Sequence, residues 1–70
     1  MHKYEIIIYW DTEDDCFVSH APELPGCCAH GKTSHEAVTS LEHAIEAWLH
    51  MNEEFGRPTP TPKGRRLQYA

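Results

Sequence analysis

The feature that most constrains the fold is an amphipathic stretch from Thr33 to about Glu54. Its apolar residues recur at steps of one and three, which places them in one stripe along a helix. These residues are Ala37, Val38, Leu41, Ala44, Ile45, Trp48 and Leu49. Thr33 and Glu36 match a capping box in which each side chain bonds the backbone N–H of the other residue, while Gly56 and Pro58 end the helix. A single helix of this kind covers one face of a sheet and no more.

The part of the chain before this helix predicts a three-stranded antiparallel meander. The predicted strands span residues 3–10, 16–21 and 27–30. An acidic turn at 11–15 and a proline- and glycine-containing connection at 22–26 join them. The first strand has apolar side chains on both of its faces. Because one helix covers only one face, we expect a homo-dimer or higher homo-oligomer that covers the other.

The last part of the chain predicts one more strand. Residues 57–64 are predicted to form an extended proline-rich link, and residues 66–69 a short C-terminal fourth strand. The expected fold class is therefore α+β, in the order βββαβ, with one long helix packed on one face of the meander. Residues 1–70 make a single domain, which is too small for a deep catalytic pocket, so we do not expect an enzyme.

Charge is distributed unevenly along the chain. Residues 1–56 contain all 11 acids and two lysines, a net charge of −9, whereas residues 57–70 carry +4. An acidic body repels a phosphate backbone and attracts a basic protein, so the charge favours a basic partner over nucleic acid.

The compartment follows from two further observations. No apolar run approaches the ~20 residues of a membrane span, and the N-terminus has no secretory signal. The chain contains an odd number of cysteines, Cys16, Cys27 and Cys28, and two of them are adjacent. This arrangement does not fit a disulfide framework. We therefore expect a cytoplasmic protein with no membrane partner.

Several motifs then occur together in one order along the chain. They are Tyr4-Glu5-Ile6-Ile7-Ile8, Phe17-Val18-Ser19, Ala21-Pro22-Glu23-Leu24-Pro25-Gly26-Cys27, Gly31-Lys32-Thr33 before Glu36-Ala37, Ala44-Ile45-Glu46-Ala47-Trp48-Leu49, and the prolines Pro58, Pro60 and Pro62. With these motifs the chain resembles the N-terminal domain of the HicB family of antitoxins over essentially its whole length. The Pro-x-Leu-Pro-Gly-Cys segment followed by Gly-x-Thr-x-x-Glu-Ala carries most of the specificity.

The resemblance implies a partial ribonuclease-H-like fold and a role in a toxin–antitoxin system. A stand-alone short form of this family would bind and mask a small basic mRNA-cleaving toxin of the HicA type. Longer members add a C-terminal DNA-binding domain, and without one we expect no DNA binding. The alternative is a solitary oligomeric scaffold, or a small-ligand-binding domain with no toxin partner.

Three acids are the predicted contacts for a basic partner. Asp14 and Asp15 lie in the acidic turn, and Glu23 lies in the connection after the second strand. Opposite charges at such positions speed the encounter of two proteins.

Sites for chemistry are weaker hypotheses. The acids of the turn suggest a metal-dependent nuclease, but a two-metal site needs carboxylates that converge from different elements, so a solvated turn is the better interpretation. Two other sets contain zinc-ligand types without a standard zinc spacing. One is His20, Cys27, Cys28 and His30, and the other is His43, Glu46 and His50. We therefore predict no catalytic residues, no metal and no cofactor.

Overall fold

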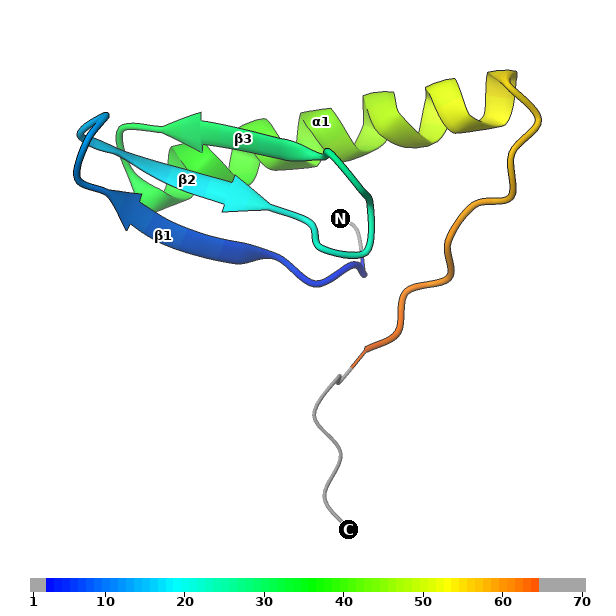
Figure 1. The fold of residues 1–70 in the computed structure, drawn as a ribbon, viewed down its shortest axis with the longest axis horizontal. Helices are drawn as coiled ribbons and strands as arrows, with labels where there is room; N and C mark the ends of the chain where they lie inside the picture. The colour runs from blue at the N-terminus through cyan, green and yellow to red at the C-terminus, as the bar shows by residue number, and fades with distance from the viewer. Residues whose placement is uncertain (1–2, 65–70) are drawn as a thin grey trace, which may run out of the picture.

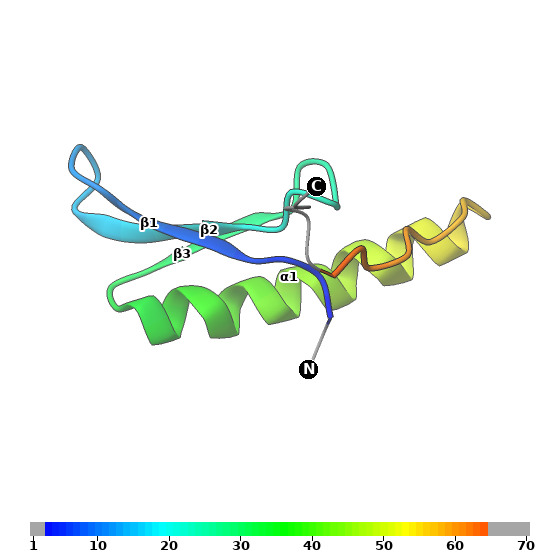
Figure 2. The same ribbon diagram turned by 90° about the horizontal axis from the view of Figure 1, so that it is seen from below.

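Three strands and one helix follow one another along the chain (Figure 1). The strands are β1 (Ile7–Asp11), β2 (Cys16–His20) and β3 (Cys28–Gly31), and the helix is α1 (Ser34–Glu54). They form an antiparallel sheet in the order β1-β2-β3, with α1 beneath it as a second layer (Figure 2). The predicted α+β class, with a three-stranded meander and one long helix, is confirmed.

The computed structural model describes residues 3–64. The predicted fourth strand at residues 66–69 lies outside this range. The second and third strands each end within one residue of the predicted bounds, a difference typical of strand ends.

The pairing register decides which residues share a face of the sheet. Ser19 lies opposite Ile8 and Ala29, and it is fully buried against α1, so these residues belong to the inner face. The alternate positions form the face turned away from α1, here called the outer face. The outer face carries Ile7, Tyr9, Asp11, Cys16, Val18, His20, Cys28 and His30.

The helix begins and ends largely as predicted. The backbone N–H of Glu36 donates to the Thr33 hydroxyl oxygen at 3.1 Å, which confirms the N-cap. The carboxylate of Glu36 does not bond back to Thr33, because it accepts the backbone N–H of Lys32 at 2.9 Å, so that half of the capping-box prediction is wrong. Gly56 follows the last turn at φ +69°, a left-handed conformation that glycine adopts at the least cost.

Two contacts hold the first turn of α1 close to the sheet. The buried Ser19 hydroxyl donates to the Ala37 carbonyl at 2.8 Å. Gly31 passes so near the helix that a Cβ there would lie 2.6 Å from the Ala37 backbone nitrogen. Because these contacts come from β2 and β3, the helix covers those two strands and touches β1 little.

The core lies between α1, the sheet and a loop that the sequence had predicted as a mere connection. It consists of Tyr4, Ala21, Leu24, Cys27, Leu41 and Ile45. Residues 21–27, here called the 21–27 loop, fold back on themselves: Leu24 N–H donates to the Ala21 carbonyl, and Cys27 N–H to the Leu24 carbonyl. These bonds satisfy part of the loop's backbone internally and let the fully buried Leu24 side chain join the core.

The first strand begins at Ile7 rather than at Lys3. Tyr4 turns into the core instead, where its hydroxyl donates to the Pro60 carbonyl. Further along the proline-rich link, the Lys63 N–H donates to the Glu23 carboxylate at 3.2 Å. The link therefore runs back from the end of α1 to the segment that precedes β1 and to the 21–27 loop.

We expect Leu24→Ala to destabilise the domain as much as Leu41→Ala, by about 2–5 kcal/mol, because both side chains are fully buried. Urea unfolding followed by circular dichroism measures this loss. Met51→Ala, at an exposed position of α1, is the control and should change the free energy of unfolding little. A Leu24→Ala variant as stable as the control would show that the 21–27 loop is not part of the core.

Candidate protein-binding surface

The large exposed apolar side chains in residues 3–64 gather in two places. They are Ile7, Ile8, Tyr9 and Trp10 on β1, and Met51 and Phe55 at the end of α1. The positions on β1 are exposed on both faces, because α1 touches β1 little. Clusters of this kind are typical of surfaces that bind other proteins.

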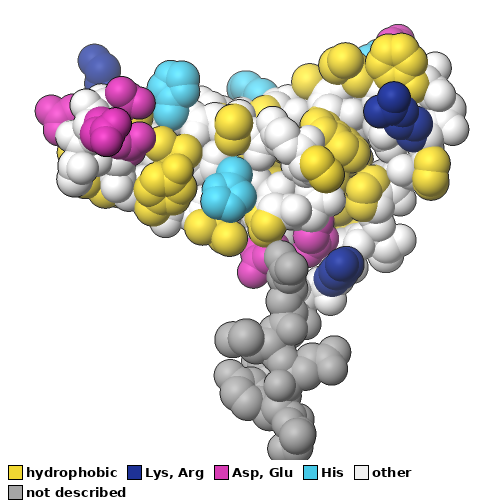
Figure 3. Space-filling view, in the orientation of Figure 1, with side chains coloured by type: hydrophobic (Ala, Val, Ile, Leu, Met, Phe, Trp, Pro, Cys, Tyr) yellow, Lys and Arg dark blue, Asp and Glu magenta, His cyan; other side chains and the backbone are white. Residues whose placement is uncertain are grey.

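An acidic hollow lies at the end of the sheet where β1 turns into β2. Asp14 and Asp15 line it together with Glu36 from the first turn of α1. Its remaining lining residues are Cys16, His30, Gly31 and Lys32. In Figure 3 acidic side chains gather at this end of the molecule.

The turn that carries these acids is built by its own side chains. The Asp11 carboxylate accepts the backbone N–H groups of Glu13 at 2.9 Å and Asp14 at 3.3 Å. Asp15 adopts a left-handed conformation, with φ at 55°, and closes the hairpin. Asp14 and Asp15 are both exposed, so their carboxylates are available to a partner.

The third predicted contact lies elsewhere. Glu23 follows β2, whereas Asp14 and Asp15 precede it, so the length of the strand separates them. One oxygen of the Glu23 carboxylate accepts the Lys63 N–H, and the other is buried with no hydrogen-bond partner within residues 3–64. Asp14 and Asp15, neighbours in the sequence, therefore share the acidic turn, whereas Glu23 makes an internal contact.

Two of the three cysteines have perturbed thiols. Burial raises the pKa of the Cys16 thiol, and the nearby carboxylates of Asp14, Asp11 and Asp15 raise it further. Burial also raises the pKa of the Cys27 thiol, and the neighbouring Cys28 raises it further. Both thiols therefore resist ionisation, which makes them poor nucleophiles and poor metal ligands near neutral pH.

The sets with zinc-ligand types do not assemble into a metal site. Cys27 is buried in the core, whereas Cys28 is exposed on the outer face, so the two cysteines point apart as predicted. On the helix, His50 contacts Glu54 at 3.2 Å. Within residues 3–64, no three histidine, cysteine or acidic side chains lie where they could share a metal ion.

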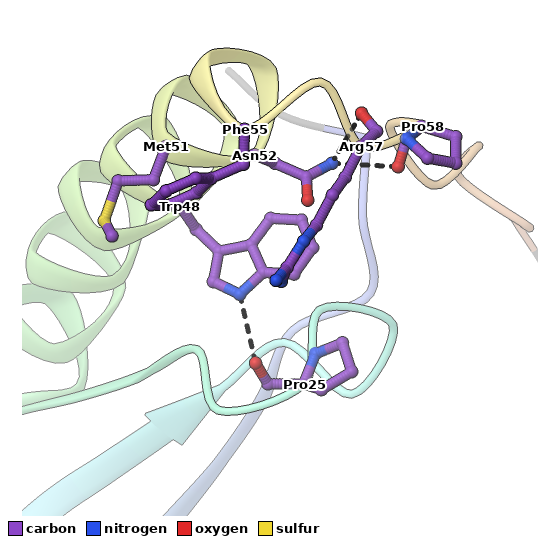
Figure 4. A pocket seen from close by; sticks show the side chains of 7 residues that line it. All are labelled: Pro25, Trp48, Met51, Asn52, Phe55, Arg57 and Pro58. Carbon is purple, nitrogen blue, oxygen red and sulfur yellow. Dashed lines mark hydrogen bonds between the residues drawn. The ribbon is translucent and has the colours of Figure 1, made fainter.

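A second hollow lies between the end of α1 and the 21–27 loop (Figure 4). It is an open groove of about 510 Å³, lined by Pro25, Trp48, Met51, Asn52, Phe55, Arg57 and Pro58. The Trp48 indole N–H donates to the Pro25 carbonyl at 3.0 Å. The buried Asn52 amide donates to the carbonyls of Arg57 and Pro58, which fixes the chain where it leaves the helix.

Sequence reasoning missed this groove, although a signal was present. Trp48, Met51 and Phe55 recur at steps of three and four, so they form a second apolar row beside the buried stripe. Glu36 was also missed as a lining residue of the acidic hollow, because it was assigned only to the helix cap.

The long helix is not a membrane span. In the described part of the chain, no helix combines the length and the apolar character that a bilayer crossing requires.

Comparison with known proteins gives two matches. A family model described as UPF0150-like matches residues 3–60. The UPF0150 protein Ta0767 of Thermoplasma acidophilum is 38% identical over 65 residues, which cover 93% of this chain and 93% of that protein. No solved structure matches the chain significantly.

We expect the double variant Asp14→Asn, Asp15→Asn to lower the pKa of Cys16, because it removes two negative charges that oppose the thiolate. Below that pKa, alkylation of Cys16 by iodoacetamide should therefore become several-fold faster. The midpoint of the rate–pH profile, followed by mass spectrometry, should move to lower pH. The pair Glu53→Gln, Glu54→Gln removes the same charge at the other end of α1 and should leave the midpoint unchanged. An equal shift in both variants would contradict a local effect of the acidic turn.

Proposed function

Because the chain belongs to the UPF0150-like family, which is related to the HicB-like antitoxins, we propose that it is a non-catalytic antitoxin. In this proposal it binds and masks a small basic mRNA-cleaving toxin of the HicA type. The partial ribonuclease-H-like fold of the HicB N-terminal domain and a cytoplasmic location belong to the same proposal.

The acidic hollow is the observation that carries the proposal. It combines three carboxylates from two elements, Asp14 and Asp15 from the hairpin and Glu36 from α1, with Lys32 as its one cation. A lysine or arginine of a basic protein would find several carboxylate acceptors there, and charge-assisted hydrogen bonds of this kind are stronger than neutral ones.

Long-range charge supports the same partner. Residues 3–64 contain all 11 acids of the chain but only four of its six lysines and arginines. Such a surplus draws a basic protein toward the acidic domain before contact. A toxin that cleaves mRNA needs a basic surface to hold phosphates, so an acidic cover on that surface competes with RNA directly. Masking of this kind requires no chemistry from the antitoxin.

The groove at the end of α1 favours the alternative, a small-ligand-binding domain with no toxin partner. Its wall contains the aromatic rings of Trp48 and Phe55, and the Arg57 guanidinium lies 5.6 Å from the centre of the Phe55 ring. An apolar hollow with one cation is suited to a small apolar anion.

The first experiment is an affinity pull-down with this chain from a lysate of its native organism, followed by mass spectrometry. We expect one small basic protein in stoichiometric amount, which cleaves mRNA once it is freed and stops when the chain is added back. Recovery of the chain without such a protein would contradict the antitoxin proposal and favour the small-ligand alternative.

The acidic hollow makes a second, kinetic prediction. We expect Asp14→Lys, Asp15→Lys to slow association with the toxin by at least tenfold at low salt, because the change replaces local attraction with repulsion. Surface plasmon resonance at several salt concentrations measures this rate.

The matched control for this prediction is Glu46→Lys, Glu53→Lys, which changes the net charge equally at exposed positions of α1. It should slow association much less. Equal slowing by both variants would mean that net charge, rather than the acidic hollow, steers the toxin.

A further inference from the structure

The groove between the end of α1 and the 21–27 loop differs in charge from the rest of the molecule. None of its lining residues is acidic, although residues 3–64 contain 11 acids. Its one charged side chain is Arg57. Figure 3 shows a basic side chain among hydrophobic ones at the end of the molecule away from the acidic turn. The acidic domain thus has an apolar hollow with a single positive charge.

The Arg57 guanidinium is available to a ligand. Among residues 3–64 it forms no ion pair with a carboxylate. It lies 5.6 Å from the centre of the Phe55 ring, a cation–π contact that holds the charge beside the groove. Such a contact does not consume the N–H donors of the guanidinium, which form a planar fork that matches a carboxylate. The polar end of a fitting ligand is therefore a carboxylate.

The walls of the groove select the rest of the ligand. Trp48 and Phe55 contribute aromatic rings and Met51 contributes a thioether, while prolines from the 21–27 loop and the proline-rich link complete the wall (Figure 4). Aromatic rings and methionine sulfur both make favourable contacts with another aromatic ring. The volume of about 510 Å³ is in the range of small-molecule sites. A small aromatic body fits this composition and size.

Internal hydrogen bonds hold these walls in place. The Trp48 indole N–H bond to Pro25 fixes the helix to the 21–27 loop. Asn52 is 8% exposed, and its amide donates to the carbonyls of Arg57 at 3.3 Å and Pro58 at 2.8 Å. Both walls are thus tied to α1 before a ligand arrives, which lowers the entropy that binding costs.

Charge also argues against other occupants. Residues 65–70 contain Arg65 and Arg66 and no acid, so Arg57 repels them, and it repels a basic protein for the same reason. An anion with an aromatic body meets no such repulsion inside the groove. We propose that the groove binds a small aromatic carboxylate, with its ring against Trp48 and Phe55 and its carboxylate on Arg57.

This site is separate from the acidic hollow. Glu36 of the hollow lies in the first turn of α1, whereas Phe55 of the groove follows the last turn. A helix rises 1.5 Å per residue, so roughly 30 Å separate the two sites. The inference therefore goes beyond the antitoxin proposal, and its tests require no toxin.

The first test is a titration of the ¹⁵N-labelled chain, followed by NMR. The probes are benzoate, 3-phenylpropionate and indole-3-acetate. We expect at least one of them to shift the indole N–H signal of Trp48 in a saturable manner, while that of Trp10 on β1 stays unchanged. No shift of the Trp48 signal by any probe up to about 10 mM, a concentration that detects even millimolar binding, would overturn the proposal.

The charge of the ligand is tested with a neutral analogue and a variant. 3-Phenylpropanol should bind about tenfold more weakly than 3-phenylpropionate, because it cannot form the charge-assisted bond to Arg57. Arg57→Gln should weaken the carboxylate by a similar factor and leave the alcohol unchanged. Lys63→Gln is the matched control, since it removes the same charge at an exposed position outside the groove. Equal weakening by both variants would overturn the proposal.

Two further measurements identify a different occupant. The full-length variant Leu67→Ser, Tyr69→Ser removes apolar side chains that residues 65–70 would need to fill the groove, and it should bind the probe as the unmodified chain does. Binding that strengthens several-fold in this variant would identify residues 65–70 as the occupant. An affinity that falls as the concentration of the chain rises would identify a second copy. Either result would overturn the proposal and leave the proposed function untouched.

Discussion

The burial of Leu41 and Ile45 is the interaction on which the rest of the structure depends. Both side chains are fully buried, and they meet the sheet together with Leu24 from the 21–27 loop. Each such burial contributes about 1.5–3 kcal/mol, a large share of the stability that a chain of this size can reach. The Ser19 bond to Ala37 and the close approach at Gly31 then fix where the helix lies.

That position decides which surfaces remain for binding. Because α1 lies under β2 and β3, both faces of β1 keep exposed apolar side chains. The acidic turn lies beyond the end of β1, beside the first turn of the helix, and there Glu36 joins Asp14 and Asp15. One small core thus separates an acidic end, where Asp14, Asp15 and Glu36 gather, from the exposed apolar side chains of β1.

Much of the fold was predictable, because periodicity reports directly on burial. The stripe from Ala37 to Leu49 predicted α1, and the alternation around Ile7 and Ile8 predicted the two faces of β1. The start of β1 was predicted too early, since Tyr4 fits the alternation but packs into the core instead. For the candidate site, the exposed acidic turn with Asp14 and Asp15 was predictable, whereas Glu36 and the groove beside Trp48 were missed.

The sequence by itself determined the elements, their order and the acidic character of the domain, because period, capping residues and charge are local properties. The tertiary structure alone decided that Leu24 belongs to the core, that the Glu23 carboxylate meets the Lys63 backbone, and that Glu36 lines the acidic hollow. These facts join residues far apart in the chain. Their pairing follows from where the helix packs on the sheet, which no local pattern records.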